Sequence, residues 1–349
     1  MAPTRTTHQA RILRARLTAQ LLAGPAARPV DAAHRLLAIQ AQDLRGARLA
    51  IRARTEGLFA ADVDHAMTVD RSLVISWLNR GTLHLVRAED YHWLHALTSP
   101  KTLAGVRRRL AQEQVTPDAA DQGVALIERA LVNDGPLTRE QLRDRLDAAG
   151  IRTKGQALVH ILAMASLRGV MVRGPMIAGR HAFALVRDWL GTARSGGRDA
   201  ALAELARRYL AGHGPADERD LAAWAGLPLR DAHAGLAAIG SELAQAGEGL
   251  VDLARRLPAE PLPPPRLLGP YDPVLHGWRS RDLVLGEHRH VVTVNGLFRA
   301  FAMVRGRAVG TWSLPHGVVR LAPFAPLSPA VAGALAADAE AVSRFLVGG

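Results

Sequence analysis

Residues 74–86 have the sequence VISWLNRGTLHLV, and this stretch decides the expected fold. Two short apolar runs, 74–78 and 82–86, flank the Gly-containing turn Asn79-Arg80-Gly81, a pattern typical of a β-hairpin. Apolar residues at helical spacing precede the hairpin over 7–22, 31–39, 44–54 and 62–68. Helices followed by a hairpin predict a winged helix, which is a variant of the helix-turn-helix motif.

The same order of elements recurs along the chain. A helix that ends at Gly150, a helix over 153–167 and a hairpin from 170–173 and 181–186 form a second copy. A third copy opens at Gly214-Pro215, which matches Gly135-Pro136 of the second, and in both copies a helix cap, Thr138 or Asp217, follows the proline by two residues. The third copy continues with a helix over 229–246 and a strand over 250–252. This internal repeat predicts three winged-helix units in tandem.

The pattern changes after residue 257. Five prolines within residues 258–265 predict a stiff linker. Beyond it, apolar runs at strand spacing cover 291–294, 298–304, 308–312 and 318–321, and a helical pattern covers 328–346. We therefore expect a mainly α chain with small β content, made of three winged-helix units and a C-terminal β-barrel with a terminal helix. The expected boundaries are 1–98, 99–195 and 196–256 for the units and 257–349 for the linker and barrel.

The composition narrows the class of protein. The chain of 349 residues has a net charge of +12, and 42 of its 44 basic residues are arginines, since Lys101 and Lys154 are the only lysines. The charge favours a nucleic-acid partner, although a high-GC genome also produces arginine-rich, lysine-poor proteins. The absence of cysteine excludes disulfides, cysteine-zinc sites and iron–sulfur clusters. No apolar run approaches the ~18–20 residues of a membrane span, so we expect a cytoplasmic protein associated with the nucleoid.

Metal and cofactor motifs are missing from the sequence. His92 with His95, and His288 with His290, are pairs without a third ligand nearby, so we expect no metal site. Phosphate-loop, GxGxxG and GxSxG motifs are also absent. The sequence therefore predicts no cofactor and no nucleotide-dependent or acyl-transfer chemistry.

Residues 37–43, LAIQAQD, are the main candidate for chemistry. On a helix, residues two apart point in nearly opposite directions, so Gln40 and Gln42 could not act on one substrate. In extended backbone they point to the same side, which requires the helix to end near Ile39. The alternative is that both are ordinary polar residues at a helix C-terminus.

Four segments together resemble one protein family. IQAQD at 39–43, RGTLHLV at 80–86, GPYDP at 269–273 and GWRSR at 277–281 occur in the order found in the winged-helix DNA glycosylases that excise alkylpurines and unhook interstrand crosslinks. That family includes the azinomycin-resistance glycosylase of antibiotic producers, and the resemblance covers essentially the whole chain. Its members carry Gln-x-Gln or Gln-x-Asp, and this chain has Gln-x-Gln, the variant associated with self-resistance to DNA-alkylating natural products.

The resemblance implies a monofunctional, monomeric DNA glycosylase that hydrolyses the N-glycosidic bond of N7-alkylguanine in double-stranded DNA, bulky or crosslinked adducts included. Gln40 and Gln42 would position a water, with Asp43 as an electrostatic helper. N7-alkylguanine is cationic and leaves readily, so a neutral glutamine suffices where a strong base is not needed. A lyase step needs an amine nucleophile, and neither lysine is near the motif. Crosslinked adducts cannot enter a tight base-flipping pocket, which favours an open groove.

Several basic residues are candidates for DNA contacts. Arginines 45, 48, 52 and 54 follow the glutamine motif, Arg80 and His84 lie on the first hairpin, and Arg279 and Arg281 lie beyond the linker. We select Arg45, Arg48, Arg80, His84, Arg279 and Arg281 as DNA-binding residues, with phosphate contact as their role. Solvated surface charge is the alternative for each. Asp272 is expected to cap a turn, and Trp77, Trp224 and Trp278 are expected in the core.

Two other functions compete with glycosylase activity. A winged-helix transcription regulator would bind DNA without catalysis, but regulators usually pair as dimers on two half-sites. Three fused units favour a monomer, and residues 153–167 are too apolar for a base-reading helix. Stoichiometric sequestration of an alkylating drug is the third possibility, which multiple turnovers of base release would exclude.

Overall fold

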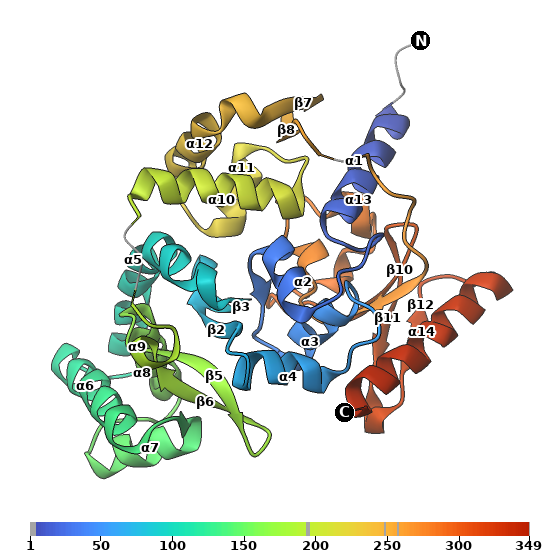
Figure 1. The fold of residues 1–349 in the computed structure, drawn as a ribbon. Coiled ribbons are helices and arrows are strands. Elements are labelled where there is room, and N and C mark those ends of the chain that lie inside the picture. Colours follow the sequence, from blue (N-terminus) through green and yellow to red (C-terminus); the bar gives the residue numbers. More distant parts are fainter. Residues whose placement is uncertain (1–4, 193–195, 248, 257, 349) are drawn as a thin grey trace. The chain divides into compact units, whose positions relative to one another are not determined.

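The computed structural model describes residues 5–192, 196–247, 249–256 and 258–348. The chain forms two compact units, of which unit 1 comprises Met1–Val63 with Leu202–Gly349 and unit 2 comprises Asp64–Ala201. In Figure 1, unit 2 is the cyan and green middle of the chain. The boundary expected between residues 98 and 99 falls inside helix α5 (Ala88–Gln112). The division of the chain into four parts stays a prediction.

The N-terminal part of unit 1 is helical, as the apolar spacing predicts. It contains α1 (Arg5–Ala19), α2 (Pro29–Leu36) and α3 (Leu44–Arg52), while α4 (Ala60–Thr68) continues into unit 2. Proline is favoured at the first position of a helix because its φ angle is already helical and its missing N–H is not needed there. Pro29 accordingly begins α2.

Unit 2 is built on the expected hairpin. Strands β2 (Leu73–Leu78) and β3 (Thr82–Arg87) are antiparallel, with Ile75 opposite Leu85. The second expected hairpin, β5 (Met171–Ile177) with β6 (Arg180–Leu185), is also present. The strand order β3-β2-β5-β6-β4 joins both hairpins in one sheet, with β4 (Leu137–Thr138) at its edge. Two hairpins expected in separate winged-helix units therefore share a sheet.

Helices of unit 2 lie between and after these strands in the sequence. They are α5, α6 (Pro117–Asp134), α7 (Arg139–Ala148), α8 (Ala157–Leu167) and α9 (Val186–Trp189). Thr138 begins α7 with a reciprocal capping box, in which Thr138 and Gln141 each bond the other's backbone N–H. The cap that the sequence indicated at Thr138 is confirmed.

The second helical part of unit 1 contains α10 (Arg198–His213), α11 (Glu218–Ala225) and α12 (Leu229–Ala238). The helix expected over 229–246 is wrong from residue 239 onward. A short 3-10 turn, η2 (Gly240–Glu242), follows α12, and β7 (Leu243–Gly247) then pairs with β8 (Leu250–Leu253). The pairing with β8 provides hydrogen-bond partners for the backbone N–H and C=O groups that a helix would otherwise pair internally.

The C-terminal region of unit 1 is an open sheet and not the barrel expected from the sequence. The strand order is β12-β11-β10-β9, comprising β9 (Arg266–Leu268), β10 (Phe301–Val304), β11 (Arg307–Ser313) and β12 (Arg320–Pro323). Among the described residues β9 and β12 do not pair, so the sheet has two edges. Helix α14 (Pro329–Val347) follows, with Ser328 as its N-cap. The number of winged-helix units stays a prediction.

Short helical turns replace one expected strand. The segment between β9 and β10 contains η3 (Pro273–Leu275), α13 (Asp282–Leu285) and η4 (Arg289–Val291), and η5 (Pro315–Gly317) lies between β11 and β12. The strand expected over 291–294 is wrong, since only Val292 forms a bridge, with Phe298.

The core is mainly aliphatic, as the low aromatic content requires. Trp77, Trp224 and Trp278 are 7%, 3% and 6% exposed, which confirms their expected place in the core. Across the described ranges of the chain, none of the helices has the length and apolar character that a membrane crossing needs.

Candidate active site

The glutamine motif begins on extended backbone and ends in a bend. Helix α2 ends before it because Leu37 adopts a φ of 63°, which is not helical. Gln40 then lies in β1 (Ile39–Gln40). Ala41 is 3% exposed, so its side chain faces the core. Gln40 therefore lies on extended backbone and Gln42 in a bend two residues later, so a shared side for the two glutamines stays a prediction.

Both glutamine amides are available for a ligand. Gln40 is 8% exposed and Gln42 is exposed. Within the part of the chain that the structure describes, neither side chain makes a hydrogen bond. A glutamine amide offers two N–H donors and one carbonyl acceptor, and leaving a nearly buried amide unpaired costs free energy. The segment therefore presents two amides that can orient a water or a sugar.

Asp43 has a structural role in the same segment. Its carboxylate accepts a hydrogen bond from the backbone N–H of Gly46 at 2.9 Å, which makes it the N-cap of α3. Such a cap contributes about 1 kcal/mol to helix stability. The cap also fixes the position of the carboxylate at the start of α3, in the residue that follows Gln42.

The GPYDP loop, residues 269–273, packs directly on α3. A Cβ atom at Gly46 would overlap the carbonyl oxygen of Pro270, and one at Gly269 would lie 2.8 Å from the Cβ of Leu49. Only glycine permits this approach of two backbones. The GPYDP segment therefore lies against α3, the helix that directly follows the IQAQD segment.

Tyr271, in this loop, lies close to Asp43. Burial raises the pKa of the Tyr271 phenol, and the negative charge of Asp43 raises it further. The tyrosine has a φ of 59°, and its ring stacks on His276 with centroids 6.2 Å apart. The resemblance includes Tyr271 in the GPYDP segment but indicates no role for it, because its proximity to Asp43 depends on tertiary packing.

Asp272 anchors the GPYDP loop through a turn cap and an ion pair. Its carboxylate accepts from the N–H of Val274 at 3.0 Å, which confirms the expected turn cap. It also pairs with Arg54, and both side chains are 0% exposed. A phosphate contact by Arg54 is therefore ruled out. Arg52 is similarly engaged, since it pairs with Asp338 of α14.

The remaining arginines of unit 1 differ in exposure. Arg45 is exposed on α3, and Arg48 is half-buried. Arg279 is exposed, and its backbone N–H donates to Asp220 at 2.9 Å. Arg281 is half-buried, donates from Nε to the Leu275 carbonyl at 2.7 Å and lies over the ring of Phe298. Arg45 and Arg279 present the most accessible charge of this set.

Arg80 and His84 lie together on the β2–β3 hairpin of unit 2. Arg80 is exposed and has a φ of 53° in the turn. His84 is only 2% exposed, and burial together with the charge of Arg80 lowers the pKa of its ring to about 3. A neutral, buried ring offers no charge to a phosphate, so we do not include His84 among the proposed DNA contacts.

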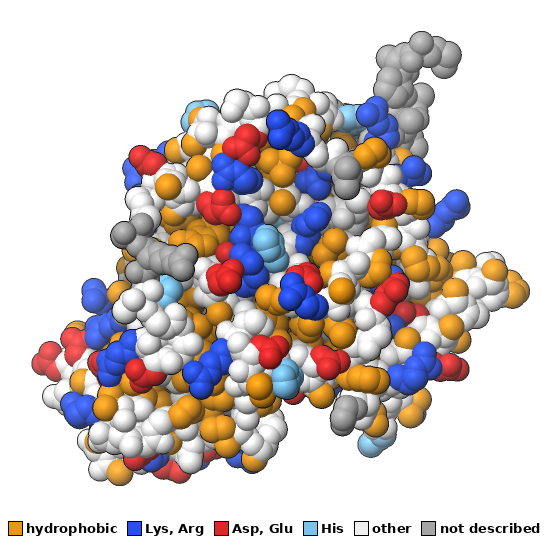
Figure 2. All heavy atoms as spheres, in the orientation of Figure 1, with side chains coloured by type: hydrophobic (Ala, Val, Ile, Leu, Met, Phe, Trp, Pro, Cys, Tyr) orange, Lys and Arg blue, Asp and Glu red, His pale blue; other side chains and the backbone are white. Residues whose placement is uncertain are grey.

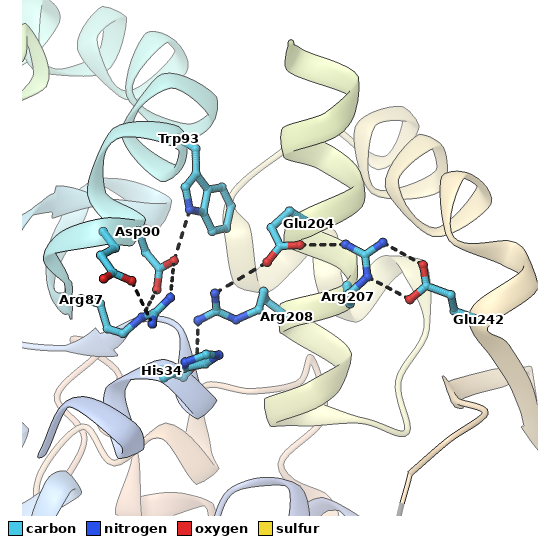
Figure 3. A network of polar contacts seen from close by, with 9 residues as sticks. His34, Arg87, Asp90, Trp93, Glu204, Arg207, Arg208 and Glu242 are labelled. Atoms are coloured by element: carbon cyan, nitrogen blue, oxygen red, sulfur yellow. Dashed lines mark hydrogen bonds and ion pairs between the residues drawn. The ribbon is translucent and has the colours of Figure 1, made fainter. Parts of the chain in front are cut away.

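Figure 3 shows polar contacts within each unit. In unit 2, Arg87 pairs with Asp90, which also accepts from the indole of Trp93. In unit 1, Arg208 donates to the carbonyl of His34 at 2.7 Å, and Arg207 joins Glu204 to Glu242. The Arg208 bond ties α2 to α10. It thereby holds the helix that leads into the glutamine motif.

The net positive charge is not gathered in one patch on the visible face. Figure 2 shows Lys and Arg side chains among acidic and hydrophobic ones on that face. Individual arginines with defined surroundings are therefore more informative than the total charge.

Comparisons with known proteins agree on one family. A family model described as "DNA glycosylase AlkZ-like" matches residues 33–345. A curated protein of Streptomyces sahachiroi named "Interstrand DNA cross-link repair glycosylase" is 28% identical over 341 residues, which covers 90% of each chain. The solved structure of Streptomyces sahachiroi DNA glycosylase AlkZ has a TM-score of 0.75 at 22% identity and covers 96% of each chain. This last similarity concerns the fold.

Proposed function

Because this chain belongs to the AlkZ-like DNA glycosylase family, we propose that it hydrolyses the N-glycosidic bond of N7-alkylguanine in double-stranded DNA. Bulky and crosslinked adducts are included, as the name of the Streptomyces sahachiroi relative suggests. The observation that carries this proposal is the pair of unbonded amides at Gln40 and Gln42, two residues apart at the end of β1.

The chemistry suits two neutral amides. Alkylation at N7 gives guanine a positive charge, so the base leaves without strong help from a general acid. The enzyme then has to hold a water against C1′ and stabilise the positive charge that develops on the sugar. The carbonyl oxygens of Gln40 and Gln42 can accept hydrogen bonds from that water. Asp43 adds a nearby negative charge that favours the cationic sugar.

Selectivity for alkylated over undamaged nucleotides follows because glutamine is a weak catalyst. A glutamine is a poor base, so an undamaged nucleotide, whose base leaves slowly, gains little from it. The exposure of Gln42 also fits an adduct that remains in the duplex, since a crosslinked base cannot be rotated into a tight pocket.

A hydrolase without lyase activity is expected. Lyase chemistry needs an amine that attacks C1′ to form a Schiff base. Neither lysine, Lys101 nor Lys154, is near the glutamine motif in the sequence. The proposed products are therefore the free base and a strand with an intact abasic site.

The alternative of a non-catalytic regulator has little support from unit 2. The candidate recognition helix, α8, has buried side chains along most of its length, with His160 and Val159 as the exceptions. A helix buried in this way cannot lie in a major groove and present side chains to base edges.

The test is product analysis with duplexes that carry one defined N7-alkylguanine, either small or bulky. We expect multiple turnovers of free base, with strand cleavage only after alkaline treatment. Failure to release base from every adduct would contradict the proposal, and release limited to one equivalent would favour drug sequestration.

A further inference from the structure

Unit 1 contains a pocket of about 420 Å³ directly beside Asp43. Helix α3, the GPYDP loop and the C-terminal sheet all contribute to its walls. Its polar lining consists of Asp43, Arg45, Arg299, Thr311, Ser313 and Arg320. The pocket therefore adjoins the glutamine motif but takes most of its side chains from the far end of the sequence.

Two of these arginines occupy matched positions on the sheet. Ser313 of β11 lies opposite Arg320 of β12. On the other side of β11, Phe301 lies opposite Thr311, and the same antiparallel register continued by two residues places Arg299 opposite Ser313. Since neighbouring strands are about 4.8 Å apart, Arg299 and Arg320 flank Ser313 with backbones roughly 10 Å apart.

The charge at this pocket is not balanced. Arg45, Arg299 and Arg320 are exposed, and among the residues that the structure describes none of the three side chains has an ion pair or a hydrogen bond. Asp43 is the one acidic residue in the lining given for this pocket, and one of its oxygens already accepts from the N–H of Gly46. Three cationic side chains beside one carboxylate, which already accepts a hydrogen bond, favour an anionic ligand.

We infer that this pocket binds one phosphodiester of the strand that carries the lesion, an inference that rests on the proposed function. Asp43 follows Gln42 directly, and consecutive Cα atoms are about 3.8 Å apart. On each strand of a duplex, one phosphate occurs about every 3.4 Å of helix axis. A phosphate held here consequently belongs to the alkylated nucleotide or to its neighbour.

Such a contact would set the register of the sugar against the glutamines. Guanidinium groups bind phosphate oxygens in a two-pronged geometry that fixes orientation as well as charge. Phosphate contacts carry no sequence information but place the duplex on the protein. Arg299 and Arg320 therefore act as positioning residues for hydrolysis of the glycosidic bond.

The first test measures the salt dependence of binding to an undamaged duplex by the full chain. Arg299→Ala and Arg320→Ala are each expected to reduce the slope of log K against log salt concentration by about 0.9, because one phosphate contact is lost. Arg307→Ala is the matched control, since Arg307 is exposed at the opposite end of β11 and lies outside the pocket lining. The control should keep the wild-type slope.

The second test neutralises single phosphates. Methylphosphonate linkages are placed one at a time around an N7-alkylguanine, and single-turnover excision is measured. For the wild type, one position next to the lesion should slow excision about tenfold. In Arg299→Ala and Arg320→Ala, that same substitution should have no further effect. The inference is overturned if the methylphosphonate and the arginine substitution slow excision independently, so that their effects multiply. It is also overturned if both pocket variants have the same salt slope as the control.

The outcomes separate this inference from the proposed function. Excision by the wild type with unchanged slopes in both pocket variants contradicts only the phosphate pocket. Reduced slopes without excision of any adduct contradict the glycosylase activity and leave the pocket as a DNA contact. A wild-type protein that binds no duplex contradicts both.

Discussion

Arg54 and Asp272, 218 residues apart in the sequence, form a two-pronged ion pair without any exposed side-chain surface. The guanidinium donates to both carboxylate oxygens, at 2.9 and 2.8 Å, and also to the side-chain oxygen of Gln20 at 2.8 Å. One buried pair thus joins the residues just after α1 and α3 to the GPYDP loop. The placement of Tyr271 beside Asp43 depends on it.

Removal of one partner of this pair should destabilise unit 1 strongly. Asp272→Ala leaves a buried, uncompensated guanidinium, which costs about 3–5 kcal/mol of unfolding free energy. Joint replacement by apolar residues, as in Arg54→Met with Asp272→Leu, should recover much of that loss. Urea unfolding followed by circular dichroism measures both. Arg28→Ala, which breaks an exposed pair with Asp31, should leave the midpoint unchanged.

Asp43 can be tested for a role beyond capping. Asparagine caps helices about as well as aspartate, so Asp43→Asn should preserve the free energy of unfolding while Asp43→Ala loses about 1 kcal/mol. If the charge of Asp43 stabilises the cationic sugar, Asp43→Asn should slow excision about tenfold. Asp217→Ala, which removes the N-cap of α11, is the control for stability loss alone. Equal excision rates for Asp43→Asn and wild type would leave Asp43 as a cap only.

Two buried histidines should make stability depend on pH. Burial lowers the pKa of His84 in unit 2 and of His213 in unit 1 to about 3. The unfolded chain, with histidine pKa values near 6.5, therefore binds more protons than the folded chain between about pH 3 and 6.5. Stability should fall as pH decreases from 6.5, by about 2 kcal/mol per histidine at pH 5. A ring that titrates near pH 6.5 in an NMR experiment would contradict this.

The absence of lyase chemistry has a direct check. Borohydride reduction during turnover should trap no protein–DNA adduct with the wild type, because neither lysine is near the glutamine motif in the sequence. The double variant Lys101→Met with Lys154→Met should excise N7-alkylguanine at the wild-type rate. A trapped adduct that disappears in the double variant would show that a lysine of unit 2 takes part.

Local signals in the sequence predicted much of the fold. The hairpin over 74–86 and the helix caps at Thr138 and Asp217 are confirmed, because alternation and capping depend on neighbouring residues alone. The β-barrel was wrong because strand periodicity identifies strands without showing which edges meet. Closure of a sheet depends on contacts between distant segments.

The candidate site shows the same limit. In the sequence, Arg54 looks like a continuation of the basic series that begins at Arg45, yet its partner Asp272 removes it from the surface. The end of α2 was uncertain for a related reason. Glycine or asparagine usually marks the positive φ at which a helix ends. Leu37 adopts a positive φ although it is neither, so its residue type does not predict the extended segment that carries Gln40.

The central claim is that Gln40 and Gln42 position the water that breaks the glycosidic bond. The most direct measurement is the single-turnover rate of base release from a duplex with one N7-alkylguanine. We expect Gln40→Ala with Gln42→Ala to lower this rate about 10²-fold or more, with duplex binding retained. Gln245→Ala, at an exposed glutamine of β7, should excise like the wild type. Undiminished release by the double variant would contradict the account.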